Sequence, residues 1–233
     1  HRSVVLLKLG ESGGDGQLLS SISRKSAEAL ALKPGKKVFA QIKGMALAGD
    51  QLCVTDITQI VCLDRASGAI AHRYPAPGAG FLNDAVASAD GRVFVSDSAT
   101  SRIYVLENGM VHVWAEDDAL SAINGLWLEA DRMLAVTMAG RFVSISLDGQ
   151  SVSVIGDGLG DGDLLSPDGQ GGYFASEWPG QLYHLMPDGR FSVLADTREA
   201  GIYVNDGYLL GDLLIVPHWQ PGEVSAWRVQ YGH

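Results

Sequence analysis

A pattern of about 40 residues recurs along this chain and constrains its fold more than any other feature. Four stretches open with Asn or Asp, run through a short apolar strand, turn at a polar or Gly-bearing step and enter a second strand, and a fifth has Lys at its head. Measured between Lys43, Asn83, Asn124, Asp163 and Asp206, the steps are 40, 41, 39 and 43 residues. Periods of this size built from four strands are typical of β-propeller blades.

The pattern predicts strands and turns from residue 44 to residue 233. The complete copies should form strands at 83–88, 92–98, 102–107 and 110–115, at 124–129, 132–138, 141–147 and 150–155, and at 163–167, 171–177, 181–186 and 190–195. The last copy has only three strands, and a strand from the other terminus would close the ring and remove exposed edges. We therefore predict an all-β propeller with five recognisable four-stranded repeats.

Residues 1–43 differ from the rest in charge and in pattern. They hold eight Lys or Arg against three acidic residues, a formal charge of +5, whereas the remainder carries −15. SVVLLKLG and QLLSSIS are strand-like, SRKSAEALAL has the pattern of a short amphipathic helix, and KPGKKVFAQIKG is a turn followed by a strand. We predict that 1–43 forms a distinct β-rich segment with one short helix, or supplies the strands that complete the propeller.

Charge and hydropathy limit the partners of this chain. Nucleic acid needs a clustered basic face, which the acidic part lacks, so we expect no nucleic-acid binding. That acidic part would instead attract cations or cationic ligands. No run approaches the roughly 18 apolar residues that a membrane-spanning helix needs.

The two cysteines, Cys53 and Cys62, flank a predicted hairpin. If Ile57 and Thr58 form a two-residue loop, the cysteines face each other directly across the strand pair. Opposed residues come close enough for a disulfide, although two reduced cysteines packed in the strands are an equal alternative. This pairing favours an exported or periplasmic protein over a cytoplasmic one, and the sequence leaves its cellular location open.

The segment LLSSISRKSAEALALKPGKKVFAQIKGMAL resembles the second half of the Mop/TOBE modules that bind molybdate and related oxyanions. The resemblance covers about residues 1–47 and implies oxyanion ligands at Lys25, Ser26 and the amide of Ala27. A helix N-terminus suits an anion because its N–H groups are free and its dipole end is positive. The first ligand-bearing strand of that family has no counterpart here. The alternative is a partial module that only packs against the propeller.

The remainder, about residues 44–233, resembles the senescence marker protein/gluconolactonase superfamily of six-bladed propellers. The motifs that carry this likeness are KGMALAGDQLCVTD, FLNDAVASADGRVFVSD, INGLWLE, GDLLSPDGQGGYFASEW and NDGYLLGDLLIVP. The family holds a divalent metal, commonly calcium, at one end of the channel, and the motifs imply the ligands Asn83, Asn124, Asp163 and Asp206. Calcium takes six to eight oxygen ligands of this kind. Asp163 would also be the candidate catalytic base partner in lactone or ester hydrolysis.

Two departures from that family bear on activity. Its metal-binding glutamate near the N-terminus has no counterpart, and Phe81 stands where the family has an arginine. Inner-strand Asn and Asp also serve as structural groups that cap neighbouring backbone. Three functions therefore stay open: small-molecule or divalent-cation binding, with metal-dependent hydrolysis if the chain is an enzyme; a non-catalytic binding or scaffold propeller with a protein partner; and oxyanion binding by the N-terminal segment.

A ligand pocket is predicted at the mouth of the channel. Trp178 and Trp219 occupy matching places in successive copies, and His218 is expected to look into the mouth beside Trp219. The predicted lining consists of Phe81, Asp84, Trp178, His218 and Trp219.

Overall fold

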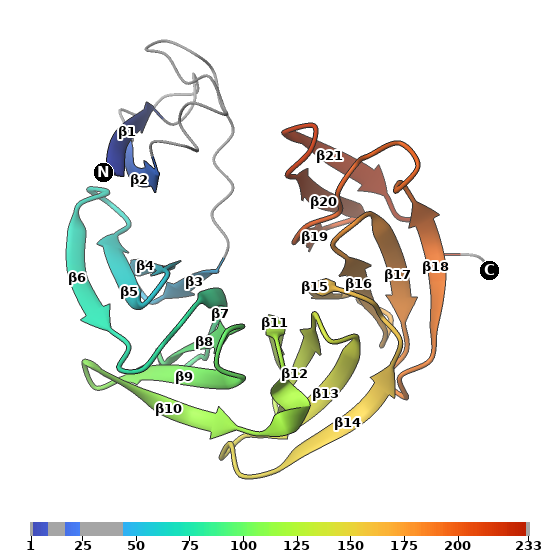
Figure 1. Ribbon diagram of the computed structural model, residues 1–233, viewed down its shortest axis with the longest axis horizontal. Coiled ribbons are helices and arrows are strands. Elements are labelled where there is room, and N and C mark those ends of the chain that lie inside the picture. The colour runs from blue at the N-terminus through green and yellow to red at the C-terminus, as the bar shows by residue number, and fades with distance from the viewer. Residues whose placement is uncertain (1, 9–16, 24–43, 232–233) are drawn as a thin grey trace.

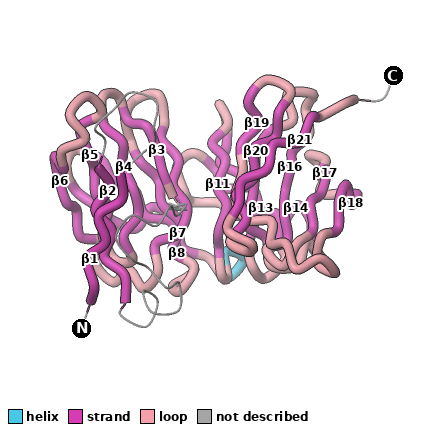
Figure 2. The backbone as a smooth tube through the Cα atoms, turned by 90° about the horizontal axis from the view of Figure 1, so that it is seen from above, coloured by secondary structure: helices cyan, strands magenta, loops and turns pink. Residues whose placement is uncertain are grey.

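The structure, a computed structural model, describes residues 2–8, 17–23 and 44–231, and strands form almost all of its regular elements (Figures 1 and 2). Within 44–231, consecutive strands pair antiparallel into five sheets. The first three sheets are β3 (Met45–Ala48), β4 (Gln51–Asp56), β5 (Gln59–Asp64) and β6 (Ile70–Pro75); β7 (Leu82–Ala87), β8 (Val93–Asp97), β9 (Arg102–Glu107) and β10 (Met110–Glu116); and β11 (Ile123–Leu128), β12 (Arg132–Thr137), β13 (Arg141–Ser146) and β14 (Val152–Asp157). The last two are β15 (Gly162–Pro167), β16 (Tyr173–Glu177), β17 (Gln181–Leu185) and β18 (Phe191–Asp196); and β19 (Tyr208–Leu210), β20 (Leu213–His218) and β21 (Glu223–Arg228).

The five sheets are propeller blades. Figure 1 shows them following one another around an arc, with β3, β7, β11, β15 and β19 innermost. The predicted all-β propeller is confirmed, and the predicted strands agree with the observed ones to within about two residues. The last blade has three strands among the described residues, as its short repeat indicates. A sixth blade is not seen in residues 44–231, and closure of the ring by the N-terminal segment stays a prediction.

The N-terminal segment contributes one strand pair to the described residues. β1 (Arg2–Lys8) pairs antiparallel with β2 (Gln17–Ser23), as the two strand-like stretches predict. The short helix predicted over SRKSAEALAL and the strand after it lie outside the described residues. The helical element that is described is a single 3-10 turn, η1 (Asp118–Leu120), which is capped by the side chain of Asp117.

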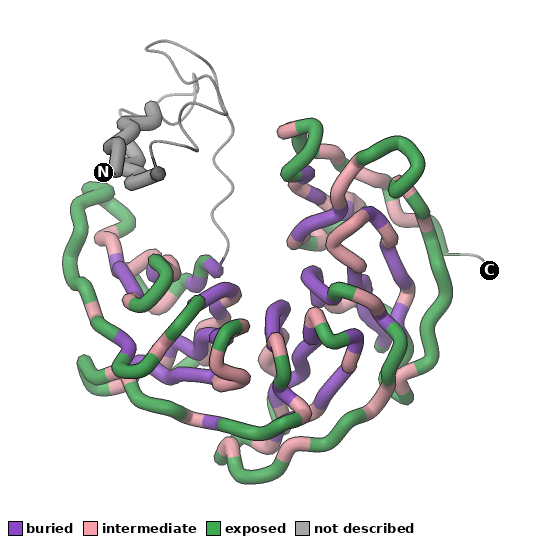
Figure 3. Tube along the Cα trace, in the orientation of Figure 1, coloured by how far each residue is buried: buried purple, intermediate pink, exposed green. Residues whose placement is uncertain are grey.

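Apolar side chains fill the spaces between neighbouring blades. β8 is buried along its whole length because both of its faces pack against other blades, whereas β6 at the outside of its blade is largely exposed. Figure 3 shows the same gradient from buried inner strands to exposed outer strands. Four clusters bind the five blades in sequence, and each draws residues from two adjacent blades. This packing fixes the starts of the innermost strands relative to one another.

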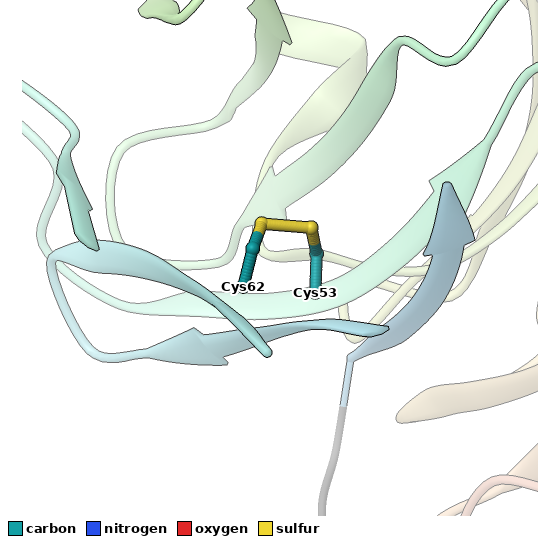
Figure 4. Close-up of a disulfide and its surroundings, with 2 residues drawn as sticks. All are labelled: Cys53 and Cys62. Atoms are coloured by element: carbon teal, nitrogen blue, oxygen red, sulfur yellow. A yellow bond between two sulfur atoms is a disulfide. The ribbon is translucent and has the colours of Figure 1, made fainter. Parts of the chain in front are cut away.

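The two cysteines form a disulfide inside the first blade (Figure 4). Asp56 pairs with Gln59 and Cys53 with Cys62, so the predicted register of the hairpin is confirmed. Both cysteines are almost fully buried and belong to the cluster between the first and second blades. The bond therefore ties together two strands that also carry part of the hydrophobic core.

Reduction of this disulfide should lower the free energy of unfolding by about 2.5 kcal/mol, because the cross-link no longer restricts the unfolded chain. The measurement is chemical denaturation with and without a thiol reductant strong enough to reach the buried bond. The Cys53→Ala/Cys62→Ala double variant is the matched control, since the reductant should leave its midpoint unchanged. Equal midpoints for the oxidised and reduced wild type would contradict this prediction.

Candidate functional site

The starts of the innermost strands lie together with the ends of the second strands at one end of the propeller. Leu82 pairs with Asp97, Ile123 with Thr137 and Gly162 with Glu177. Because second strands run antiparallel to the innermost ones, the turns that follow them reach the same end. The polar head residues and the predicted pocket residues therefore share one face of the ring.

Asp163 is the centre of a buried hydrogen-bond network that joins three blades. The Asn124 side-chain amide donates to Oδ1 of Asp163 at 3.0 Å and to the Gly162 carbonyl at 3.2 Å. The Asn205 amide donates to Oδ2 of Asp163 at 3.3 Å. All three side chains are at most 3% exposed. Both carboxylate oxygens thus hold neighbouring blades together.

Asn83 serves the same purpose by a different route. Its amide donates to the Ser98 hydroxyl at 3.1 Å, and that hydroxyl donates to the Ile123 carbonyl of the next blade at 2.6 Å. The Thr55 hydroxyl of the preceding blade donates to the Asn83 carbonyl at 2.8 Å. The structure therefore places Asn83 in a chain of contacts between the first three blades.

The head position of the last blade belongs to Asn205, which corrects the choice of Asp206 made from the sequence. Asn205 is the residue that reaches Asp163, and its Oδ1 accepts the Trp219 N–H at 2.8 Å. Asp206 corresponds instead to Asp84, because each accepts the N–H of the residue after it at 2.7 Å. The dipeptide Asn-Asp occurs at the head of the second copy and of the last copy. The spacing alone therefore could not show which of its two residues takes the head position in the last blade.

Asp84 is a carboxyl group at this end whose pKa is shifted by its surroundings. Burial raises its pKa well above 3.8, and the charges of Asp206 and Asp163 raise it further. The backbone N–H groups of Leu126 and Ala85 donate to its carboxylate at 2.8 and 2.7 Å and oppose the rise without cancelling it. Burial and the two neighbouring carboxylates therefore favour the protonated, neutral form of Asp84.

The raised pKa of Asp84 predicts that stability falls as the pH rises. The folded state keeps a proton that the unfolded state releases above pH 3.8, so the stabilisation is complete below that pH and is lost as the pH rises through the raised pKa. Asp84→Asn cannot ionise and should flatten this part of the profile. Melting temperatures of both proteins between about pH 4 and pH 8 measure the effect, and parallel curves would show that Asp84 does not cause it.

Two of the predicted calcium-ligand positions are occupied by contacts within the protein. The amides of Asn124 and Asn205 point their N–H groups at Asp163, and Oδ1 of Asn205 is taken by a backbone N–H. Among the described residues, no group of three or more His, Cys, Asp or Glu is positioned to hold a metal ion. Calcium binding, and a catalytic role of Asp163 that depends on it, stay predictions.

Asp97 positions the loop that leads into the second blade, and sequence reasoning missed it. It is fully buried and accepts the N–H groups of Gly80 and Phe81 at 2.8 and 2.9 Å. Burial opposes its ionisation, but these bonds prevail and lower its pKa. Phe81 is 42% exposed, and its place in a ligand pocket stays a prediction. The one sequence signal for the role of Asp97 is that it stands at the end of the second strand of its repeat.

His218 makes hydrogen bonds through both ring nitrogens, and its predicted place in the ligand pocket stays a prediction. Its side chain is buried, with Nδ1 at 2.6 Å from the Tyr203 carbonyl and Nε2 at 2.7 Å from the Ser225 hydroxyl. A carbonyl only accepts, so Nδ1 carries the proton and Nε2 accepts from the serine. The imidazole is thereby fixed between a loop and β21.

An aromatic cluster, formed by Trp178, Tyr203 and Trp219, occupies the same end between the last two blades. The ring centroids are 4.7 Å apart for Trp178 and Tyr203, 5.3 Å for the two tryptophans, and 6.1 Å for Tyr203 and Trp219. The structure thus brings together the two tryptophans predicted for the pocket. Tyr203 was missed because it lies in the connection between blades, where the repeat sets no register.

The predicted oxyanion ligands Lys25, Ser26 and Ala27 lie outside the described residues, so no geometry bears on them. A family match, however, covers the segment that contains them. Residues 3–48 match the TOBE domain. This match extends through β3, so residues 45–48 belong both to it and to the innermost strand of the first blade.

Curated proteins match this chain over the same N-terminal segment. The molybdenum import ATP-binding protein ModC of Thiobacillus denitrificans is 51% identical over 49 residues, and that of Rhodopseudomonas palustris is 51% identical over 48 residues. Each alignment covers 21% of this chain and 13% of the relative. The chain therefore spans about an eighth of the length of these relatives.

Solved structures match over most of the chain. Virginiamycin B lyase of Staphylococcus aureus is 14% identical with a TM-score of 0.61, over 82% of this chain and 70% of the lyase. A chain of a nidogen/laminin complex is 18% identical with a TM-score of 0.69, over 80% and 75%. The extracellular domain of a putative one-component system of B. thetaiotaomicron is 14% identical with a TM-score of 0.60, over 86% and 29%. These likenesses show the fold alone, so the gluconolactonase-type identification stays a prediction.

The described part of the chain contains no helix that is long and apolar enough to cross a membrane.

Proposed function

We propose that this chain binds a molybdate-type oxyanion through its N-terminal TOBE segment and uses the propeller as a binding scaffold. The observation that carries the first part is the 51% identity to molybdenum import proteins across the segment that matches the TOBE domain. The predicted ligands Lys25, Ser26 and Ala27 lie inside that match. Lys25 would supply charge, and backbone N–H groups would supply the hydrogen bonds that an oxyanion needs.

Titration calorimetry of the full chain with molybdate and tungstate tests oxyanion binding. Lys25→Ala should weaken molybdate binding by about tenfold or more, because a charge-assisted hydrogen bond contributes about 1.5–3 kcal/mol. Lys33→Ala, from the same basic segment but outside the predicted ligand set, is the matched control and should bind like the wild type. Absence of any heat with molybdate, or equal affinities for Lys25→Ala and the wild type, would overturn the proposal.

The scaffold role of the propeller is supported by what its head residues do. Asn124 and Asn205 donate hydrogen bonds to Asp163 and so connect three blades. Asn83 donates to Ser98 and accepts from Thr55, and with the bond from Ser98 to the next blade these contacts also connect neighbouring blades. Side chains used in this way stabilise the ring without supplying a nucleophile or an open metal site. The fold itself does not select an activity.

Metal-dependent lactone or ester hydrolysis is the competing proposal for the propeller. It requires Asp163 to ligate a divalent cation, and its test is an assay with a sugar lactone in the presence of calcium or manganese. Turnover that disappears both with a chelator and in Asp163→Asn would replace the scaffold proposal by an enzymatic one. Lack of turnover with either ion would leave the propeller as a binding domain.

A further inference from the structure

The three rings of the aromatic cluster are inclined to one another and do not form a flat stack. The planes of Trp178 and Tyr203 are inclined by 60°, those of the two tryptophans by 36°, and those of Tyr203 and Trp219 by 62°. Trp219 is 58% exposed, and the other two rings are half-buried. The exposed part of Trp219 is therefore the part of the cluster that a bound group would reach first.

Backbone hydrogen bonds hold the three aromatic residues in place. The Val204 N–H donates to the Trp178 carbonyl at 3.3 Å, and the Tyr203 N–H donates to the Gln220 carbonyl at 3.0 Å. The Trp219 N–H donates to the buried Asn205 side chain. The cluster is therefore anchored to the same network that surrounds Asp163, which limits the freedom of its three segments.

Acidic residues adjoin the aromatic cluster along the chain, which from residue 44 onward holds more acidic than basic residues. Glu177 directly precedes Trp178, and the Trp178 N–H donates to the Asp161 carbonyl at 2.8 Å. Asn205 connects Trp219 to Asp163, and Asp206 follows Asn205 in the chain.

One cation, Arg198, also lies nearby. Its guanidinium is paired with Asp196 at 2.5 Å and contacts Glu177 at 3.4 Å, so carboxylates already offset its charge. Aromatic faces and carboxylates both attract positive charge, whereas a neutral or anionic ligand would gain only from the rings.

We propose that Trp178, Tyr203 and Trp219 form a binding site for a compact organic cation of the quaternary ammonium type at this end of the propeller. The ring faces provide cation–π contacts, and the neighbouring carboxylates provide the longer-range attraction. The site does not depend on oxyanion binding by the N-terminal segment, because a different part of the chain forms it.

The test compares choline with its uncharged isostere 3,3-dimethylbutan-1-ol on the full chain, by calorimetry in the presence of a chelator. Choline should bind at least about fivefold more tightly, since a cation–π contact contributes about 1 kcal/mol. Trp219→Ala should weaken choline binding by about two- to fivefold, whereas Trp219→Phe should retain part of the affinity. Met110→Ala removes another largely exposed apolar side chain, from an outer strand, and should leave the affinity unchanged.

Three results would overturn this proposal. They are a lack of saturable choline binding, equal binding of choline and its isostere, and an unchanged affinity in Trp219→Ala. The second result would mean that the cluster recognises apolar shape and not charge. Because Trp219 is largely exposed, its substitution should leave the fold intact, and an unchanged melting temperature confirms this before each titration.

Discussion

Asp163→Ala is expected to lower the free energy of unfolding by about 4 kcal/mol, because hydrogen bonds to a charged acceptor contribute about 1.5–3 kcal/mol each. The variant loses the bonds from Asn124 and Asn205 at once and leaves both buried amides without that acceptor. Since those amides come from the two flanking blades, the loss weakens the ring at two interfaces. Denaturant unfolding followed by circular dichroism measures the change.

Two further variants isolate the cause. Asp163→Asn keeps one side-chain acceptor and should fall between the wild type and Asp163→Ala. Asp131→Ala removes an exposed carboxylate from a turn and should change stability by less than about 0.5 kcal/mol. If Asp163→Ala were as stable as Asp131→Ala, the network around Asp163 would not hold the blades together.

Asp163→Ala also decides the calcium prediction. If calcium binds through Asp163, the ion should raise the melting temperature of the wild type and not that of the variant. No rise in the wild type would remove the calcium site while leaving the structural role of Asp163 untouched. The two roles are therefore separable in one set of measurements.

The repeat predicted the fold well because a propeller is determined by local pattern. Strand length, alternation and turn residues recur in each copy, so an error in one blade does not spread to the next. The cysteine register followed in the same way from a two-residue hairpin loop. Closure of the ring is different in kind, because it depends on contacts between the chain ends that no local pattern encodes.

The site was predicted less completely because it depends on which neighbour each polar side chain meets. The sequence identified Asn83, Asn124 and Asp163 as equivalent, and the structure places each at the start of an innermost strand. Their partners across the blades could not be read from spacing. The sequence therefore could not distinguish ligands that face an open centre from donors that face a carboxylate. The same limit hid Asn205, which differs from Asp206 by one position.

The boundary between the N-terminal segment and the propeller is shared rather than sharp. The TOBE match ends at residue 48, whereas the first blade begins with β3 at Met45. In the structure β3 pairs with β4, and it lies beside β7 of the next blade. The short apolar run MALA forms the innermost strand of the first blade. The residues that match the TOBE domain therefore extend into the first propeller sheet.

Gly125→Ala is expected to cost about 3 kcal/mol, since an added methyl group here overpacks a position where two innermost strands meet. A Cβ at Gly125 would lie 2.2 Å from the Asp163 carbonyl oxygen and 3.1 Å from a Val136 methyl group. A backbone oxygen cannot rotate away, so the third and fourth blades would have to separate. In the NGL motif, Asn124 thus donates a hydrogen bond to Asp163. Gly125 lets the strand that carries Asp163 approach closely enough to accept that bond.

Gly91→Ala separates this steric effect from the general cost of losing a glycine. Gly91 has φ +88 with nothing within 4 Å of an added Cβ, so its substitution strains only the local backbone, at about 1 kcal/mol. Chemical denaturation of both variants should therefore show the larger loss for Gly125→Ala, with Asn124 losing its contact to Asp163 as the strands move apart. Equal losses in the two variants would mean that the close approach at Gly125 does not hold the third and fourth blades in register.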